Sequence, residues 1–390
     1  FVILLYITAQ YLIVRAIILK DKYVEAIKWY FIKMRKIIIL LVVFCSAACK
    51  PERVSLKFLN EFVVKDSLRF KNTIIGGISG IDFNNNQYYM VVDDAKNPRV
   101  LIGNIFVKND SIKSVDFKTI TQINTTSQFY KNNILDIESV FVENHQINLV
   151  SEGSINKGKN PSVFKIDSLG KFIESAKIPA YFYAGSKAKP KHNGTFEGSS
   201  KSYDKKGFWV AMEAPLEADG EESTFYETQS PIRITYFDKK TTSATKQFTY
   251  QLEKIDKPAK GKVNLNGVTA ILEYTENSFF VVERIYQSGY GSFGNTVRIF
   301  KATINEKTTN TLTLQSLKEE KYITLKKELL FDFTDIKEVL TDNIIDNIEG
   351  ITFGPVLSNG NRSLILVSDD NFQIYGKQLN QFLLLEIEEK

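Results

Sequence analysis

The chain has 390 residues, of which 43% are hydrophobic and 24% charged, and its formal net charge is +5. The basic excess lies in residues 1–48, which hold seven of the 50 Lys and Arg and two of the 45 acids, so the remainder carries 43 of each sign. A near-neutral remainder argues against the basic surface of a nucleic-acid-binding protein, and it is long enough to bury a sizeable core. Both cysteines precede residue 50, so neither a disulfide nor thiol chemistry is expected after it.

The first 48 residues resemble targeting sequence. From Met34 the chain reads as a short basic region, an apolar run at 37–44 and small residues before Cys49, which is the order found in a secretory signal. A Cys directly after Ser-Ala-Ala resembles the lipobox of bacterial lipoproteins. We therefore expect a signal peptide at 34–48 and a lipid on Cys49; a plain cleaved signal is the alternative.

The residues ahead of that signal, 1–33, are expected to be upstream translation. The alternative is a transmembrane helix at 1–19, because about 19 apolar residues can span a bilayer. In either case the expected location is the bacterial cell envelope, facing the periplasm or the exterior. The lipid anchor would then be the membrane contact.

One short phrase recurs five times after the signal. It consists of an apolar residue, a polar residue, a small residue and then a short strand. The polar positions, 59, 59, 69 and 83 residues apart, are Ser79, Glu138, Glu197, Asn266 and Glu349. Each phrase is followed by a second apolar strand that ends in an acid: Asp93, Glu152, Glu213, Glu283 and Asp369. Recurrence at blade-sized intervals indicates a radial repeat architecture.

These repeats predict an all-β single domain at 58–390, a β-propeller of five or six blades, preceded by a tether at 49–57. Alternating apolar strands of four to eight residues with Asn- and Gly-rich turns support that fold class. An immunoglobulin-like sandwich would also have short strands, but it would not repeat one acid at one place. A strand near 58–64 is expected to pair with 382–387, which would close a sixth blade.

Three further segments carry expectations. Residues 185–194 and 215–231 lack strand patterns and are expected to be long loops. One short helix is expected within 333–345.

Each repeat is expected to form an antiparallel hairpin, in which the start of one strand faces the end of the other. This predicts Glu138 opposite Glu152, Glu197 opposite Glu213 and Glu349 opposite Asp369. Ser79 with Asp93 and Asn266 with Glu283 complete the five pairs. Arranged radially, eight carboxylates would share one rim of the central channel.

Such a rim requires a cation, protons or basic partners at neutral pH. Oxygen ligands and only two histidines favour Ca²⁺, with Mg²⁺ or Mn²⁺ as alternatives, over zinc. Solvated acids at strand ends are the simpler interpretation of any single copy. The predicted metal ligands are Asp93, Glu138, Glu152, Glu213, Glu283, Glu349 and Asp369.

Three phrases resemble the phytase-like esterase family of bacterial secreted proteins: Phe196-Glu197-Gly198, Val281-Val282-Glu283-Arg284, and Asn347-Ile348-Glu349-Gly350-Ile351 with Ser368-Asp369-Asp370-Asn371. The resemblance extends from about 76 to 371. It implies a propeller and a phosphoester or ester hydrolase related to calcium-dependent propeller phytases. The fourth copy has Asn266 in place of an acid, so a full ring of equivalent metal sites is not expected.

No Gly-x-Ser-x-Gly elbow, Cys/His pair or phosphate-binding Gly-rich loop is present. Attack by metal-activated water, with Glu197 as base, is therefore the expected mechanism. His192 is a candidate acid or base, and Arg284 and Arg99 are candidate substrate-binding residues. Their simpler interpretations are a solvated loop histidine and structural ion pairs.

The expected function is a monomeric, lipid-anchored, metal-dependent hydrolase of phosphoesters or related esters. It would act on a small anionic or ester substrate and would not bind nucleic acid. One alternative is a non-catalytic propeller, stabilised by Ca²⁺, that binds a ligand or partner. A second alternative is a lactonase-like sugar hydrolase, for which Asn266 would be the required amide ligand.

Overall fold

The computed structural model describes residues 2–46, 53–318 and 320–389, which fall into an N-terminal segment and a compact unit, Val54–Glu388. The N-terminal segment contains one helix, α1 (Val2–Ser46). Within it, Ile3–Arg35 is long and apolar enough to cross a membrane, a property that signal sequences share. Cys49 and the predicted cleavage position lie outside the described residues.

The compact unit is a propeller of five four-stranded antiparallel blades. Blade one contains β4 (Ile78–Asn84), β5 (Gln87–Val92), β6 (Arg99–Val107) and β7 (Ile112–Gln122). Blades two and three contain β8 (Ile137–Glu143), β9 (Gln146–Ser151), β10 (Ser162–Ile166), β11 (Phe172–Ser175), and β12 (Phe196–Lys201), β13 (Gly207–Met212), β14 (Pro231–Asp238), β15 (Ser243–Gln251). Blades four and five contain β16 (Asn264–Thr275), β17 (Ser278–Gln287), β18 (Asn295–Thr303), β19 (Lys326–Asp332), and β20 (Asn347–Phe353), β21 (Ser363–Asp369), β22 (Asn380–Glu389), β1 (Val54–Val64).

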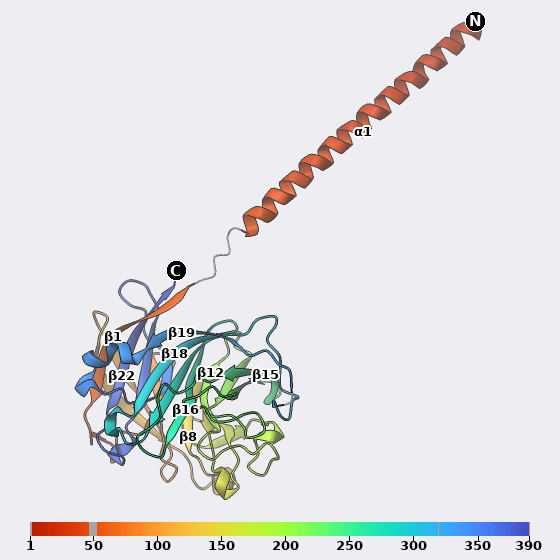
Figure 1. Ribbon diagram of the computed structural model, residues 1–390. Coiled ribbons are helices and arrows are strands. Elements are labelled where there is room, and N and C mark those ends of the chain that lie inside the picture. The colour runs from red at the N-terminus through yellow and green to blue at the C-terminus, as the bar shows by residue number, and fades with distance from the viewer. Residues whose placement is uncertain (1, 47–52, 319, 390) are drawn as a thin grey trace. The chain divides into compact units, whose positions relative to one another are not determined.

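The ring is closed by the two ends of the propeller sequence. The innermost strands β4, β8, β12, β16 and β20 contact one another in turn, and β20 also contacts β4. The outer strand of the fifth blade is β1, which pairs with β22 and lies beside it in Figure 1 (orange beside blue). The all-β propeller is therefore confirmed with five blades. The predicted terminal strands do pair, but they complete the fifth blade rather than a sixth.

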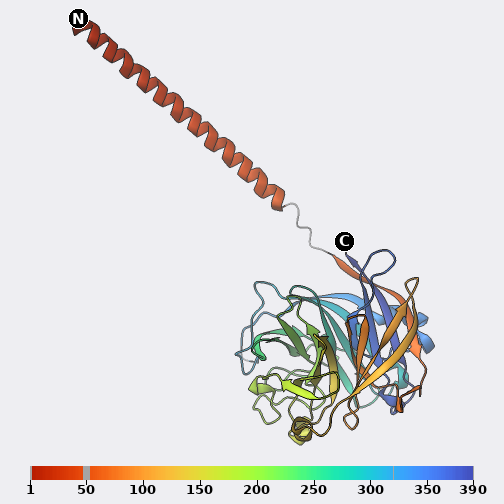
Figure 2. The same cartoon turned by 180° about the vertical axis from the view of Figure 1, so that it is seen from behind.

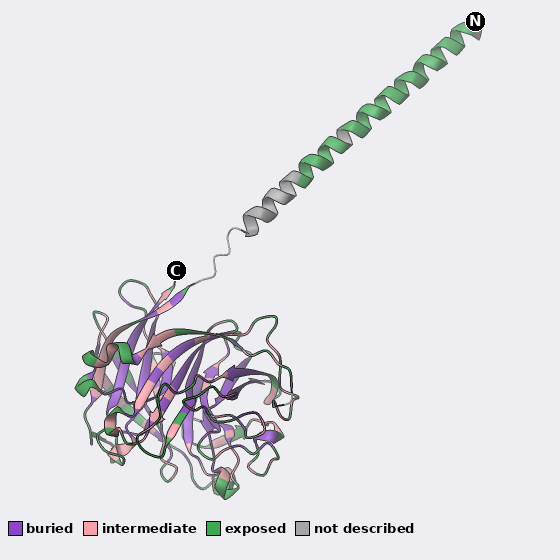
Figure 3. Ribbon diagram, viewed as in Figure 1, coloured by how far each residue is buried: buried purple, intermediate pink, exposed green. Residues whose placement is uncertain are grey.

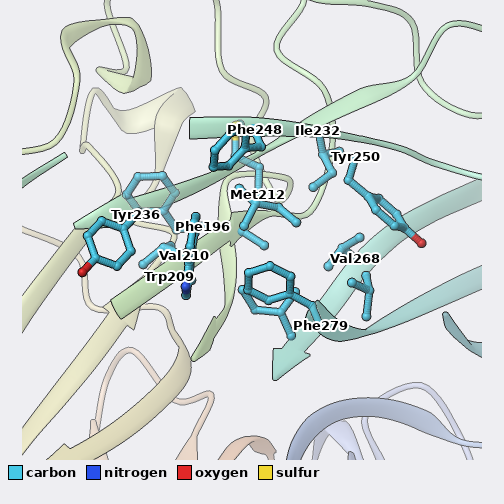
Figure 4. Close-up of a cluster of buried hydrophobic side chains, with 14 of the residues drawn as sticks. Phe196, Trp209, Val210, Met212, Ile232, Tyr236, Phe248, Tyr250, Val268 and Phe279 are labelled. Carbon is cyan, nitrogen blue, oxygen red and sulfur yellow. The ribbon is translucent and has the colours of Figure 1, made fainter. Parts of the chain in front are cut away.

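The strands nearest the axis are buried on both faces because each blade packs between two others. Figure 3 shows these strands buried and the connecting loops exposed, and Figure 2 shows the same blades from behind. Between blades three and four, Trp209 meets Phe279 edge-on with 5.1 Å between ring centroids. Phe196, Met212 and Phe248 join them in one buried cluster (Figure 4). Such a core supplies the stability that disulfides would otherwise provide.

Two glycines after the repeated polar residue allow the inner strands to approach closely. A Cβ at Gly198 would lie 2.9 Å from the Cα of Ala270 on β16. At Gly80 it would lie 2.9 Å from the backbone oxygen of Glu138 on β8. No side chain fits at such distances, which explains the recurrence of glycine in the phrase.

The loops of the structure agree only in part with those predicted from the sequence. Residues 185–194 and 215–230 contain no strand, as expected, and β14 begins at Pro231. The segment 304–325 between β18 and β19 was not anticipated; it runs along the outer strand β15, where Thr311 and Leu325 donate backbone hydrogen bonds to Gln247 and Thr249, 2.8 and 2.9 Å long. It covers an edge that would otherwise be open for pairing.

The short helical elements are α2 (Gln128–Asn132) and six 3₁₀ turns, three of which are Ile155–Lys157, Ala180–Phe182 and Gly291–Phe293. The helix expected within 333–345 consists of two further turns, Phe333–Val339 and Thr341–Asn343, and the sixth is Asn371–Gln373. Strand β1 begins at Val54 and so includes the last four residues of the predicted tether.

Candidate functional site

A cavity of about 640 Å³ opens at the end of the ring where the inner strands begin and their partners end. Among the described residues that line it are two cations, Arg284 and Lys377, and nine carboxylates: Asp93, Asp136, Glu138, Glu152, Glu197, Glu213, Asp346, Glu349 and Asp369. Seven of the eight acids predicted to share a rim are in this lining. The exception is Glu283.

A β-bulge in each inner strand positions the repeated polar residue. In blade two, Ile137 pairs with Ser151 and Ser139 with Val150, so Glu138 is the extra residue. Corresponding shifts lie at Ser79 in blade one and at Glu349 in blade five, and blade three has its shift between Phe196 and Ser199. Bulges redirect side chains next to functional sites. The predicted pairings of Asp93, Glu152, Glu213 and Asp369 with the repeated polar residue are wrong. In each of these blades the terminal acid lies opposite the residue two places earlier: Gly77, Asp136, Thr195 or Asn347.

The fourth blade has a different register from the one predicted. Its bulge lies at Thr269, and Val268 pairs with Glu283. The residue equivalent to Glu138 is therefore Thr269 rather than Asn266. Arg284, one residue after Glu283, takes the position that an acid occupies in the other four blades.

The two residues with hydroxyl groups at this position make matching contacts. Ser79 Oγ donates to the backbone oxygen of Ile137, 2.7 Å away, and Thr269 Oγ1 donates to that of Ile348, 2.8 Å away. Each bond joins one inner strand to the next. Where the residue is Glu, the carboxylate lines the cavity instead.

Glu283 is a buried partner of other side chains rather than part of the cavity. Its carboxylate accepts hydrogen bonds from the hydroxyl of Tyr250 at 2.6 Å and from Asn266 Nδ2 at 2.8 Å, and it forms an ion pair with Lys327. Tyr250 is labelled in Figure 4. Asn266 does not line the cavity either, so the lactonase-like alternative loses its proposed amide ligand.

Three carboxylates come together on one side of the cavity. One oxygen each of Asp93, Asp136 and Glu138 lies within 4.8 Å of the others. Asp93 and Asp136 also share a carboxyl–carboxyl hydrogen bond. Asp136 was not among the residues predicted from the sequence. It lies two residues before Glu138, and Glu152 donates a backbone hydrogen bond of 3.0 Å to it across the hairpin.

Glu138 and Glu197 are buried, and neither has a partner among the described residues. Their exposed fractions are 7% and 6%. Within the described part of the chain, neither carboxylate has a hydrogen bond or ion pair, although both line the cavity. Burial, followed by repulsion from nearby carboxylates, raises the pKa of each well above its usual value. An unpaired buried carboxylate is costly unless a proton or cation accompanies it.

The other acids of the rim are also shifted toward the protonated state. Burial and the hydrogen bond with Asp136 raise the pKa of Asp93 to about 9. Burial raises the pKa of Glu152 to about 8, with a further contribution from Glu213. Burial also raises the pKa of Glu349 to about 8, although Arg284 opposes that shift. Without a cation, the site holds protons at neutral pH.

Arg284 neutralises the opposite side of the cavity. Its Nη2 lies 3.0 Å from Glu213 Oε1 and 3.8 Å from Glu349 Oε1, and its Nη1 donates to Asn347 Oδ1. The Nε atom is buried and has no partner among the described residues. The cavity floor therefore has an anionic half and a half occupied by arginine ion pairs.

Two other predicted residues lie away from the cavity lining. Arg99 is 2% exposed, and its Nη1 donates to Asp94 Oδ2 over 2.9 Å, so it is a buried structural cation. His192 is exposed in the loop before β12 and does not line the cavity. Of the neighbouring lysines, Lys189 and Lys191 form ion pairs with acids of the 215–231 loop, both with N–O distances of 3.1 Å.

The donor set of the anionic half fits a hard divalent cation. The three clustered ligands are carboxylates, and no histidine is among the described lining residues. Two oxygens on opposite sides of Ca²⁺ are about 5 Å apart, against about 4 Å for Mg²⁺. Oxygens that lie within 4.8 Å of one another are close enough to bind one such cation together.

Sequence comparison identifies one family. The family described as "Phytase-like: Esterase-like activity of phytase" matches residues 73–372, which include the described lining residues of the cavity except Tyr375, Lys377 and Gln378. No curated protein matches the chain.

Structural comparison finds distant propellers. An α-L-arabinofuranosidase from Podospora anserina is 10% identical, with a TM-score of 0.40, over 85% of this chain and 97% of that chain. The allergen Mala s 1 from Malassezia sympodialis is 8% identical, with a TM-score of 0.37, over 86% and 78%. At such scores these likenesses carry no argument about function.

Proposed function

The chain belongs to the phytase-like family, and from that premise we propose that it is a metal-dependent hydrolase of phosphoesters or related esters. The family description supports a hydrolase-type propeller. Metal dependence rests on one observation above all: Glu138 and Glu197 are buried in the cavity lining without partners in the described chain, and Glu138 clusters there with Asp93 and Asp136.

Asp93, Asp136 and Glu138 would hold the cation, with Ca²⁺ favoured over Mg²⁺ or Mn²⁺. When bound, a divalent cation polarises an ester or phosphoryl oxygen and lowers the pKa of water. It would also lower the pKa of the surrounding carboxyls, because an opposite charge nearby favours their ionised form.

Glu197 is suited to act as the base. It has no hydrogen bond or ion pair within the described chain, and burial, followed by repulsion from Glu213 and Glu349, raises its pKa, so once ionised it has a strong affinity for a proton. A base must reach the water that it deprotonates, and a free carboxylate in the lining satisfies that condition. Arg284, fixed by Glu213 and Asn347, would hold a substrate oxygen by charge.

The proposal includes the cellular context. We expect a monomer, tethered to the cell envelope by a lipid on Cys49, that faces the periplasm or exterior. This expectation rests on the residues before the propeller and is independent of the site.

The test is hydrolysis by the propeller, residues 53–390, of nitrophenyl phosphate, nitrophenyl acetate and a simple lactone. Each is assayed after chelation and again with added Ca²⁺. We expect hydrolysis to require the cation and Glu197→Gln to lower kcat at least about a hundredfold, since general acid–base catalysis contributes about that much or more.

Glu273→Gln is the matched control. Glu273 is also 6% exposed, but it is bonded to Trp209 Nε1, 2.9 Å away, and does not line the cavity. Hydrolysis that is indifferent to both chelation and Glu197→Gln would refute the mechanism. A chelator that lowers the melting temperature, with no hydrolysis of any substrate, would favour a purely structural cation.

A further inference from the structure

The inner hairpin of blade four is longer than the others. Strands β16 and β17 have 12 and 10 residues, whereas the two innermost strands of every other blade have six or seven. The hairpin therefore continues past Arg284 and the level of the acids. In the added length Leu265 pairs with Tyr286, and both residues line the cavity.

The extension forms part of an apolar wall, defined here as Val263, Leu265, Tyr286 and Tyr375. All four line the cavity, and Val263, Leu265 and Tyr375 are 38%, 41% and 77% exposed. Single exposed apolar residues are ordinary, but four that line one cavity next to buried charges indicate a binding surface.

Tyr375 comes from the loop between β21 and β22, which is joined to blade four. Ser292 Oγ, in the loop between β17 and β18, donates to the backbone oxygen of Lys377 over 2.6 Å. The wall is thus built from two blades whose loops are bonded to each other, on the side of the cavity that Arg284 occupies.

The charge of the lining opposes a polyanionic substrate. Nine carboxylates face two cations, and both cations have acidic partners: Arg284 has Glu213, and Lys377 has Asp342, 2.7 Å away. Even with one divalent cation bound and several carboxylates protonated, the cavity lining would carry no net positive charge. A ligand with many phosphates needs several unpaired cations within a few ångströms.

Resting on the proposed hydrolase function, we propose that the substrate is an ester of an apolar or aromatic alcohol that carries no more than one anionic group. The alcohol part lies against Leu265, Tyr286 and Tyr375. The ester group then reaches Arg284 and the acids of the floor. An inositol polyphosphate does not fit this arrangement, because it is polyanionic and has no apolar face.

The test measures binding separately from catalysis. Naphthylmethyl phosphonate, which has no ester bond to cleave, is titrated calorimetrically into the Ca²⁺-supplied propeller beside methyl phosphonate and inositol hexakisphosphate. We expect the naphthyl compound to bind at least about tenfold more tightly than either, as expected for burial of an aromatic group.

Variants of the wall give the second readout. Leu265→Ser and Tyr375→Ala should each weaken naphthylmethyl phosphonate about tenfold and leave methyl phosphonate unchanged. Tyr375 is so exposed that its truncation does not threaten folding. Ile374→Ser is the control: Ile374 is 73% exposed on the same loop but does not line the cavity.

The outcomes separate this inference from the proposed function. Tighter binding of inositol hexakisphosphate, or unchanged binding in both wall variants, overturns the inference even if esters are hydrolysed. Wall-dependent binding of the naphthyl compound without hydrolysis of any ester supports the binding surface and refutes the hydrolase. Naphthyl esters with a lower KM than methyl esters, together with loss of that difference in Leu265→Ser, support both.

Discussion

Arg284 is the residue that breaks the symmetry of the acidic ring. It takes the position at the end of the second strand that Asp93, Glu152, Glu213 and Asp369 occupy in the other blades. An acid there would have added repulsion; the arginine instead pairs with Glu213. The result is a cavity in which Arg284 pairs with Glu213 while Asp93, Asp136 and Glu138 cluster without a cationic partner among the described residues.

Replacing Arg284 should therefore destabilise the protein in a pH-dependent way. In Arg284→Met, Glu213 and Glu349 lose the opposing charge and their pKa rises further, so stability is lost as pH rises through the new values. The melting temperature of the metal-free variant should fall more at pH 8 than at pH 5, relative to the unchanged protein.

Arg298→Met provides the comparison for that measurement. Arg298 pairs with Asp332 at 2.7 Å, and hydrogen bonds outweigh burial to lower the pKa of Asp332. That stabilisation is complete above pH 5, so its loss should be the same at pH 5 and pH 8. Equal losses for both variants would contradict the role assigned to Arg284.

At the residue scale, the sequence predicts an acidic site at the end of the channel more reliably than it predicts which residues line that site. The recurrent acids identify seven of the lining carboxylates, because their residue type and their spacing can both be recognised in the sequence. Asp136 was not predicted, and Arg284 was predicted in the lining but not at the position that an acid has in the other blades, because the bulges were not visible in the sequence. Because the register of blade four differs by one residue from the one predicted, Glu283 contacts Lys327 and Tyr250 instead of lining the cavity.

At the scale of the element, the bulged inner strand is the unit that makes the site. It turns the polar residue toward the axis while the next position approaches the neighbouring strand closely. The terminal pairing of β1 with β22 was predictable from two apolar strands at the ends of the propeller. The segment 304–325 along β15 was not, because backbone hydrogen bonds hold it to that strand and its few side-chain contacts, such as those of Asn310 and Leu325, form no periodic pattern.

Gly198→Ala tests this close approach. The added Cβ would lie 2.9 Å from the backbone of β16, so we expect the free energy of unfolding to fall by about 1–3 kcal/mol, the usual range for overpacking. Urea denaturation measures it. Gly185→Ala should change the free energy little, because nothing lies within 4 Å of its Cβ position; similar losses at both sites would contradict the packing argument.

At the scale of the whole molecule, the acidic ring links stability to pH and metal. Acids with a raised pKa in the folded protein bind protons more tightly than in the unfolded chain. Their stabilisation is complete below the unfolded pKa of about 4 and is lost as pH rises toward 8 to 9.

The metal-free propeller should therefore melt at a lower temperature at pH 9 than at pH 5. Added Ca²⁺ should raise the melting temperature more at the higher pH, because cation and protons compete for the same carboxylates. Thermal melts at both pH values, with and without Ca²⁺, measure this. A Ca²⁺ effect that is larger at pH 5 would contradict it.

The propeller architecture followed from the repeats because five copies of one hairpin can bury their apolar faces only against one another. The number of blades did not follow, because loops of unequal length make the spacing of the repeats vary from 59 to 83 residues. The apolar wall, built from blades four and five, was not predicted either, because Leu265 was interpreted as the apolar residue that opens the fourth phrase.

The central claim is that Asp93, Asp136 and Glu138, rather than Glu283, hold a divalent cation. Calorimetric titration of Ca²⁺ into the chelator-treated propeller, Glu138→Gln and Glu283→Gln tests it most directly. We expect Glu138→Gln to weaken Ca²⁺ binding at least about tenfold. Glu283→Gln should leave the affinity unchanged while it lowers the melting temperature through the loss of the Lys327 pair. Equal Ca²⁺ affinity in the unchanged protein and Glu138→Gln would contradict the account.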